Sequence, residues 1–219
     1  MPKQSARPTA PVPAPALADH RIRQRRGQVR RQQIIDAAVE LFAERGLRGT
    51  DIVDVAERVG MTAPGLMYYF GTKERLLREA VSERERADAA DGLEDLTLAG
   101  LRDIGRHNAS NPLLTRLYVM LGAESLDPHQ PLHSYFVERY EQARSLFTLI
   151  VERDRERGLV RADVDARQVG TEILAVIMGA EIQWLADPSS VDLPTVMDAF
   201  ISRLVVDLAP RRVPVRRSR

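Results

Sequence analysis

Apolar residues recur at spacings of three and four over most of the chain, which is the period of an amphipathic α-helix. Between residues 34 and 81 the pattern is divided into short runs by Gly46, Gly60 and Gly71. Four helices are therefore predicted in this segment, because glycine suits the left-handed backbone that commonly ends a helix. The apolar positions of the first, second and fourth runs are Ile34, Ala37, Ala38, Leu41 and Phe42; Ile52, Val55, Ala56 and Val59; and Leu76, Leu77, Ala80 and Val81.

A threonine precedes each of the second, third and fourth runs, where its hydroxyl can accept a hydrogen bond from an unpaired backbone N–H. We expect Thr50, Thr62 and Thr72 to begin these helices. Pro64 lies in the first turn of the third helix, where a missing N–H does little harm. The third helix is predicted to be short, since Gly71 ends it within three turns.

Beyond Val81 the helical pattern continues and is interrupted by turn residues, with no pattern typical of strands. The segment from Val169 to Leu185 is apolar on most sides, as expected for a helix covered by its own subunit on one face and by something else on the other. The chain is therefore predicted to be all-α, with about nine helices. The predicted breaks are Asp91-Gly92, Asn111-Pro112, Asp127 to Pro131, Gly158 and Asp187-Pro188.

Composition narrows the class of protein. Of the 219 residues 44% are apolar, which is enough for a substantial core. The absence of cysteine excludes disulfides, thiolate zinc sites and cysteine nucleophiles. The N-terminus lacks the apolar segment of a secretory signal, and no apolar run approaches membrane-spanning length, so we expect a cytoplasmic protein without a membrane partner.

Positive charge gathers at the two ends of the chain, although the net charge is only +1. Residues 1–33 carry a net +7 and residues 211–219 a net +5, so residues 34–210 carry −11. Such ends favour a polyanionic partner, although solubilising tails have the same composition. Because proline and alanine dominate the first 20 residues, residues 1–27 are predicted to be a disordered basic arm, and residues 211–219 a basic tail.

The second and third runs have the spacing of a helix-turn-helix, in which a supporting helix packs behind a helix that faces outward. Small Ala56 permits close packing, Gly60 allows the bend, and Leu66 holds the third helix to the core. An ordinary helical bundle with a tight turn has the same spacing. Residues 28–77 are predicted to form this first domain, and residues 78–210 a larger helical domain.

Specific residues at these spacings resemble the DNA-binding domain of the tetracycline-repressor (TetR) family, in which an AA-x-x-LF-x-x-x-G helix leads through a helix-turn-helix to a Y-x-x-F-x-x-K-x-x-L segment. The resemblance covers residues 34–77, and MGAEIQWLADP near the C-terminus also resembles the family. It implies a ligand-responsive transcriptional regulator, most simply a repressor that binds a palindromic operator in double-stranded DNA as a homodimer and is released by a small-molecule effector. The matching residues are Ala37, Ala38, Leu41, Phe42, Gly46, Thr50, Ala56, Gly60, Thr62, Leu66, Phe70, Lys73 and Leu76.

The resemblance also implies which residues meet DNA. Thr50, Tyr69 and Lys73 would bind phosphates, whereas Thr62, Ala63, Pro64, Gly65 and Met67 would face the major groove. Family members usually have tyrosine in place of Met67 and a pair such as Lys-Gly in place of Ala63-Pro64, so apolar contacts and DNA shape would contribute more to recognition here.

Two aromatic residues and the basic stretch before the first helix complete the predicted interface. Tyr68 either contacts DNA or packs against the first helix, whereas Phe70 is expected in the core. The stretch Arg21 to Arg31, with Arg30 and Arg31 at its end, either follows DNA phosphates or is merely solvated.

In the second domain the resemblance implies a ligand cavity between the middle helices, and a dimer bundle formed by Val169–Leu185 and Leu193–Leu208. Trp184 is expected to be an ordinary buried aromatic rather than a ligand contact. The candidate cavity residues are His107, Tyr118, Glu124, Phe136, Tyr140, Phe147, Ile177, Met178 and Glu181.

Competing functions are an enzyme and an adaptor. His129 and His133 with Glu124 are the best candidates for a metal or catalytic group, but Pro128 and Pro131 favour a surface loop. We therefore expect no catalytic residue, no metal and no cofactor. A helical adaptor without specific DNA binding, or a transcriptional activator of the same fold, is the alternative to a repressor.

Overall fold

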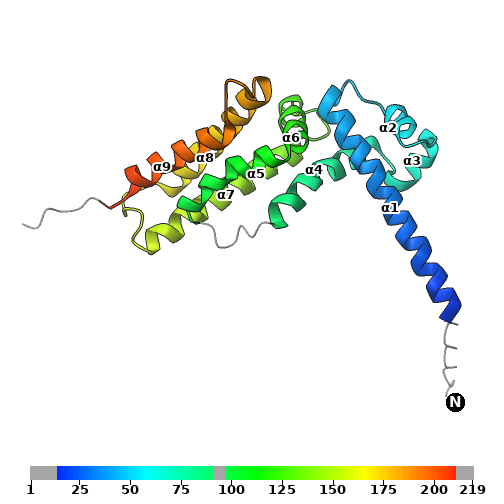
Figure 1. Ribbon diagram of the computed structural model, residues 1–219, viewed down its shortest axis with the longest axis horizontal. Coiled ribbons are helices and arrows are strands. Elements are labelled where there is room, and N and C mark those ends of the chain that lie inside the picture. Colours follow the sequence, from blue (N-terminus) through cyan, green and yellow to red (C-terminus); the bar gives the residue numbers. More distant parts are fainter. Residues whose placement is uncertain (1–13, 91–96, 211–219) are drawn as a thin grey trace, which may run out of the picture.

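The computed structural model describes residues 14–90 and 97–210, and these residues form nine α-helices, one 3-10 helix and no strand (Figure 1). The all-α prediction is therefore confirmed. The helices are α1 (Ala14–Arg45), α2 (Ile52–Arg58), α3 (Ala63–Phe70), α4 (Lys73–Ala90), η2 (Ala99–Asp103), α5 (Ile104–Ser110), α6 (Pro112–Glu124), α7 (His133–Glu156), α8 (Ala166–Ala186) and α9 (Leu193–Leu208).

Most predicted helix ends coincide with turn residues. Gly46, Gly60, Gly71 and Gly158 all adopt positive φ, between 64° and 76°. Asn111 begins α6 by accepting a hydrogen bond from the backbone of Leu114, and Pro112 follows it as the first helical residue. The predicted break at Asp91-Gly92 lies outside the described residues.

The predicted disordered arm is wrong for residues 14–27, since they belong to α1. This helix continues without a break into the apolar run at Ile34, and its N-terminal part projects away from the rest of the molecule (Figure 1). Arginine, glutamine and alanine are good helix formers, so a helix that begins in the apolar run can extend outward through them. Residues 1–13 and the predicted tail at 211–219 lie outside the described residues.

One hydrophobic core joins the first four helices to α6 and the start of α7. From α6 it takes Leu117 and Leu121, and from the α7 region Leu132 and Phe136. Helix α4 crosses the predicted boundary at residue 77 as one unbroken helix. The two predicted domains are therefore packed together through a shared core. Its largest fully buried side chains in the first four helices are Ile34, Ile35, Leu41, Phe42, Leu66, Phe70, Leu76 and Leu77.

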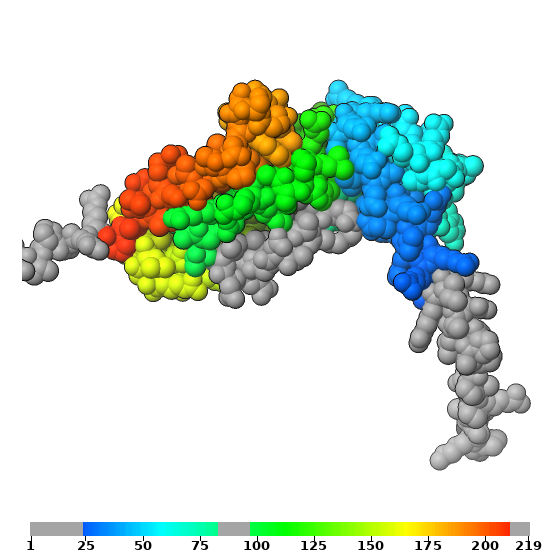
Figure 2. Space-filling view, viewed as in Figure 1, coloured from blue at the N-terminus to red at the C-terminus, as the bar shows by residue number. Residues whose placement is uncertain are grey.

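A second core lies among η2, α7, α8 and α9, at the other end of the molecule (Figures 1 and 2). Helix α8 contributes Val169, Ile173, Ile177 and Ala180 to it. Contrary to the sequence expectation, α8 is long and apolar enough by length and composition to cross a membrane. Its inward face is buried against neighbouring helices, as in the core helix of a helical bundle.

A substitution at Gly60 tests why glycine is needed in the turn between α2 and α3. Replacing Gly60 by Ala should lower the free energy of unfolding by about 1–2 kcal/mol, because φ is +64° there and a β-carbon strains the left-handed conformation. Chemical denaturation measures this change. The control is Gly27→Ala within α1: a β-carbon added at either glycine would meet no atom within 4 Å, so the control should be neutral or stabilising. Equal effects of the two substitutions would contradict the explanation.

Candidate nucleic-acid interface and cavity

The turn between α2 and α3 has the geometry expected for a helix-turn-helix. The backbone N–H of Gly60 donates to Glu57 O at 3.0 Å, and that of Met61 donates to Ala56 O at 2.9 Å. Thr62 then caps α3, since its hydroxyl accepts from the N–H of Gly65 at 3.3 Å. The predicted roles of Gly60 and Thr62 in the backbone are confirmed.

Helix α3 packs one face against the shared core and presents the opposite face to solvent. Leu66 and Phe70 are buried in the shared core. Pro64 and Tyr68, four residues apart on the other face, are exposed, and Tyr68 is 89% exposed. The alternative in which Tyr68 packs against the first helix is therefore wrong, and the predicted burial of Phe70 is confirmed.

The remaining predicted residues of α3 lie between these two faces. Gly65 and Met67 are partly exposed beside Tyr68. Ala63 and Tyr69 pack on the rim of the core, and the Tyr69 ring meets that of Tyr68 edge to face at 5.9 Å. The surface open to a partner is thus centred on Pro64 and Tyr68, whereas Ala63, which was predicted to face the groove with Pro64, packs on the core.

The assignment of Thr50 to phosphate binding is not supported by its side chain. Thr50 is fully buried, and its hydroxyl donates to Leu41 O on α1 at 3.1 Å. Asp51 takes the N-cap position of α2 instead, and its N–H donates to the carboxylate of Asp54 at 2.7 Å. The Thr50 hydroxyl therefore fastens the start of α2 to α1, and the prediction that it caps α2 is wrong.

Lys73 stands at the start of α4, as predicted, and already has partners within the protein. Its ammonium donates to Leu47 O at 3.2 Å and lies 3.4 Å from Asp51 Oδ1. Thr72 caps the helix by accepting from Arg75 N at 3.2 Å. The loop between α1 and α2 thus determines where the Lys73 charge is held.

Arg30 and Arg31 are partly exposed and have hydrogen-bond partners within the protein. Arg30 donates to Val59 O at the end of α2 at 2.6 Å, a position where positive charge is favourable. Arg31 forms a two-point ion pair with Glu79 of α4, at 2.6 and 3.2 Å, and its guanidinium lies 4.9 Å from the centre of the Phe70 ring. These arginines tie α1 to α2 and α4, whereas Arg25 and Arg26 are exposed farther out on α1.

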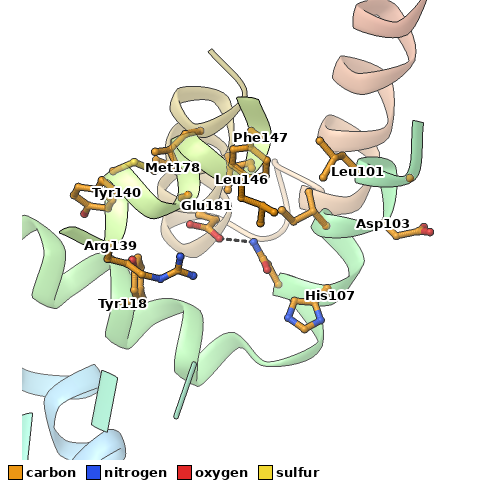
Figure 3. A pocket seen from close by; sticks show the side chains of 16 residues that line it. Leu101, Asp103, His107, Tyr118, Arg139, Tyr140, Leu146, Phe147, Met178 and Glu181 are labelled. Carbon is orange, nitrogen blue, oxygen red and sulfur yellow. Dashed lines mark hydrogen bonds between the residues drawn. The ribbon is translucent and has the colours of Figure 1, made fainter. Parts of the chain in front are cut away.

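A cavity of about 360 Å³ lies in the second domain, bordered by η2 and by α5 to α8 (Figure 3). Seven of the nine predicted residues line it: His107, Tyr118, Tyr140, Phe147, Ile177, Met178 and Glu181. Phe136 is buried behind the wall in the shared core, and Glu124 lies elsewhere on α6. Trp184 packs on the second core and is not among the lining residues.

Polar groups in the cavity gather around one buried pair. The amide of Asn108 on α5 donates to Glu181 Oε1 on α8 at 2.6 Å, and both side chains are buried (Figure 3). Burial, and then the nearby Glu181 carboxylate, raise the pKa of Tyr140 above its ordinary value. Sequence reasoning missed Asn108 and Arg139, because a polar residue on a predicted helix does not reveal whether it faces a cavity.

The cavity has an apolar wall with charge at one side. The guanidinium of Arg139 lies 5.9 Å from the centre of the Tyr118 ring, and both residues line the space. Most of the other lining residues are apolar, among them Leu101, Ile104, Leu146 and Leu174, while Asp103 and His107 also line the space. The space fits an amphipathic molecule with a polar end near Asn108, Glu181 and Arg139.

The predicted histidine loop carries no comparable arrangement. His129 is exposed and its ring lies 2.9 Å from Asp127 Oδ1, whereas His133 contacts Ser125 O at 2.9 Å. Within residues 14–90 and 97–210, no group of three His, Cys, Asp or Glu side chains is placed to hold a metal ion.

Comparison with known proteins finds similarity to one family of bacterial regulators. Residues 34–80 match the description "Bacterial regulatory proteins, tetR family". The chain is 28% identical over 199 residues to the HTH-type transcriptional repressor KstR2 of Mycobacterium tuberculosis H37Rv, covering 70% of this chain and 94% of that protein. It is 26% identical over 192 residues to KstR2 of Rhodococcus jostii, covering 82% and 91%.

A solved structure has the same fold. The transcriptional regulator FadR from Bacillus subtilis, in complex with stearoyl-CoA, superposes with a TM-score of 0.66 at 23% identity, over 80% of this chain and 97% of that one. At this identity the likeness establishes the fold alone.

The buried pair in the cavity can be tested by stability. Asn108→Ala should lower the free energy of unfolding by about 1–3 kcal/mol, because it removes a donor from the buried Glu181 carboxylate. Thermal or urea unfolding measures the loss. The matched control is Gln183→Ala. The Gln183 amide is exposed on α8 and donates only to Gly179 O of the same helix among the hydrogen bonds described, so its loss should change stability little. An equal loss in both variants would contradict a specific role for the pair.

Proposed function

Because this chain belongs to the TetR family of transcriptional regulators, we propose that it is a ligand-responsive repressor. It binds a palindromic operator in double-stranded DNA as a homodimer, and a small molecule releases it. The observation that carries this proposal is the outward face of α3, held by Leu66 and Phe70 and presenting Pro64 and Tyr68 beyond a helix-turn-helix bend.

In this proposal α3 lies in the major groove. Pro64 and Gly65 bring little side chain between the helix backbone and the base edges, so they permit close approach, and Met67 offers an apolar contact to thymine methyl groups. Thr62 and Tyr68 carry the hydroxyl groups of this surface, and Tyr68 reaches farthest from the core. Sequence preference then rests on few hydrogen bonds and on DNA shape.

Phosphate contacts position this helix on the duplex. Lys73 and the partly exposed Tyr69 flank α3 at its C-terminal side, and Arg25 with Arg26 supplies further positive charge on the outer part of α1. Arg30, Arg31 and Thr50 support these groups from inside the domain, through the contacts described above.

The effector in this proposal is a mainly apolar molecule with a polar end. The cavity volume of about 360 Å³ and its aromatic and aliphatic wall support this class. Asn108, Glu181 and Arg139 offer donors and acceptors for the polar end. Binding shifts the protein between two arrangements of its DNA-binding helices only as far as the effector's affinities for them differ.

Dimerisation through α8 and α9 is supported by an apolar outer surface. On α8 the outward face carries Ala175, Gly179 and Ile182, with open space beside Gly179. On α9 it carries Val196 and Val206, the latter 74% exposed. Small residues beside larger apolar ones allow two helices to approach closely, as a symmetric four-helix bundle requires.

DNA binding is tested with the purified protein and its own upstream region, by fluorescence anisotropy at two salt concentrations. Saturable binding should require a palindromic site and weaken as salt rises. Tyr68→Ala should weaken binding about tenfold without loss of stability, because this side chain is 89% exposed. The control is Val137→Ala, which shortens an exposed apolar side chain on α7 (52% exposed) and should have no effect. Binding that ignores competitor sequence would instead favour the adaptor.

The dimer is tested by sedimentation velocity. Ile182→Asp should shift the protein toward monomer, since it places a charge in the centre of the proposed apolar contact. Leu159→Asp alters a residue of nearly equal exposure outside that surface, and should leave the sedimentation coefficient unchanged. If the wild-type protein sediments as a monomer at micromolar concentration, the proposed interface is absent.

A further inference from the structure

Glu124, the last residue of α6, reaches across to the loop that follows α1. Its Oε2 accepts a hydrogen bond from the backbone N–H of Leu47 at 2.5 Å. The carboxylate also lies against Gly46, since a β-carbon at that position would stand 2.3 Å from Glu124 Oε1. A side chain predicted to line the ligand cavity therefore connects the second domain to the DNA-binding helices.

The carboxylate occupies an electrostatically unfavourable place. It lies at the C-terminal end of α6 and beside the C-terminal end of α1, where helix dipoles disfavour negative charge. A charge-assisted hydrogen bond to Leu47 offsets this disadvantage. The helix ends themselves thus give no reason for a glutamate here, whereas the link to Leu47 does.

A charge in the α1–α2 loop also acts on the loop that follows α6. Asp127, just after α6, has its pKa lowered chiefly by hydrogen bonds from His129, with further contributions from the charges of His133 and of Arg48 in the α1–α2 loop. Arg48 and Asp127 are both exposed. The hydrogen bond from Leu47 N–H to Glu124 Oε2 therefore joins these two loops, and the Arg48 charge adds only a solvent-screened attraction.

Leu47 is also the residue whose carbonyl holds Lys73. The Lys73 ammonium donates to Leu47 O at 3.2 Å and lies 3.4 Å from Asp51. The backbone of Leu47 therefore contacts both sides. Its N–H donates to Glu124 of the second domain, and its C=O accepts from Lys73, the proposed phosphate-binding lysine.

Helix α6 extends this connection to the cavity. Tyr118 lines the cavity and precedes Glu124 by six residues on the same helix, which corresponds to about 9 Å along the axis. A shift of the cavity wall at Tyr118 therefore moves Glu124 with it, because α6 is one unbroken helix.

We propose that Glu124 is a positioning residue, which couples the cavity to the DNA contact of Lys73 through the backbone of Leu47. This inference rests on the proposed function. With the Glu124 hydrogen bond in place, the α1–α2 loop holds Lys73 where it meets the operator phosphate. When α6 shifts, the loop is released and the operator affinity falls.

A double-mutant cycle on operator affinity tests the coupling. Glu124→Ala and Lys73→Ala should each weaken binding about tenfold. In the Lys73→Ala background, Glu124→Ala should weaken it by no more than about twofold, because both changes remove the same contact. Glu124→Gln, which keeps an acceptor oxygen for Leu47, should restore most of the affinity. Glu172→Ala, which removes an exposed carboxylate bonded within α8, should change nothing.

Additive losses would overturn the coupling even if the protein binds its operator well, since Glu124 would then act independently of Lys73. Wild-type protein that shows no operator preference would overturn the proposed function, and this inference with it. Hydrogen exchange tests the Glu124–Leu47 contact without DNA. The Leu47 amide should exchange faster in Glu124→Ala than in wild type or Glu172→Ala. An unchanged exchange rate would overturn the inference by itself. Faster exchange spread evenly over the amides of the core would show a variant that is merely destabilised, and would also overturn it.

Discussion

The burial of one face of α6 in the core of the first four helices limits how the two halves of the molecule can move relative to each other. Leu117 and Leu121 are fully buried there, in the same cluster as Leu41 of α1 and Val81 of α4. Packed cores resist small displacements. A shift of α6 must therefore move these neighbouring side chains or force them to repack with strain. Tyr118, which directly follows Leu117 on α6, lines the cavity. Ligand and DNA surfaces therefore share one rigid element, and no flexible linker lies between them in the described residues of α6.

Local sequence signals predicted the bend and helix ends, because each depends on one residue and its nearest neighbours. Gly60 needs only its own positive φ, and Thr62 needs only the N–H of Gly65. Thr50 was misassigned because its partner is a carbonyl nine residues earlier on another helix, which no local pattern contains. For the same reason the cavity was predicted in part: helical periodicity pointed to Tyr118 and Ile177, but it could not separate the wall from the packed core behind it.

The arginines of the basic N-terminal region differ in their surroundings, which a count of charges cannot show. A count of arginines predicts attraction to a polyanion, but Arg31 forms a two-point ion pair with Glu79 beside the Phe70 ring. Arg30 binds the carbonyl end of α2. These contacts fix α1 against the helices that carry the proposed recognition surface, and they use hydrogen-bond donors of both guanidinium groups. The outer arginines Arg25 and Arg26 remain exposed, on a helix whose direction is set by the inner pair.

The composition of α3 also limits how regulation can work in a repressor of this kind. Its outward face is centred on Pro64 and Tyr68, so it offers few side-chain donors or acceptors for base edges. Discrimination by one such surface is modest, and a palindromic site read by two copies multiplies it only if both α3 helices enter the groove together. Affinity then depends steeply on the separation and tilt of the two surfaces. In the proposed coupling, a small displacement of α6 that is carried through the shared core and the α1–α2 loop weakens joint binding, and the effector need not cover the DNA-binding surface.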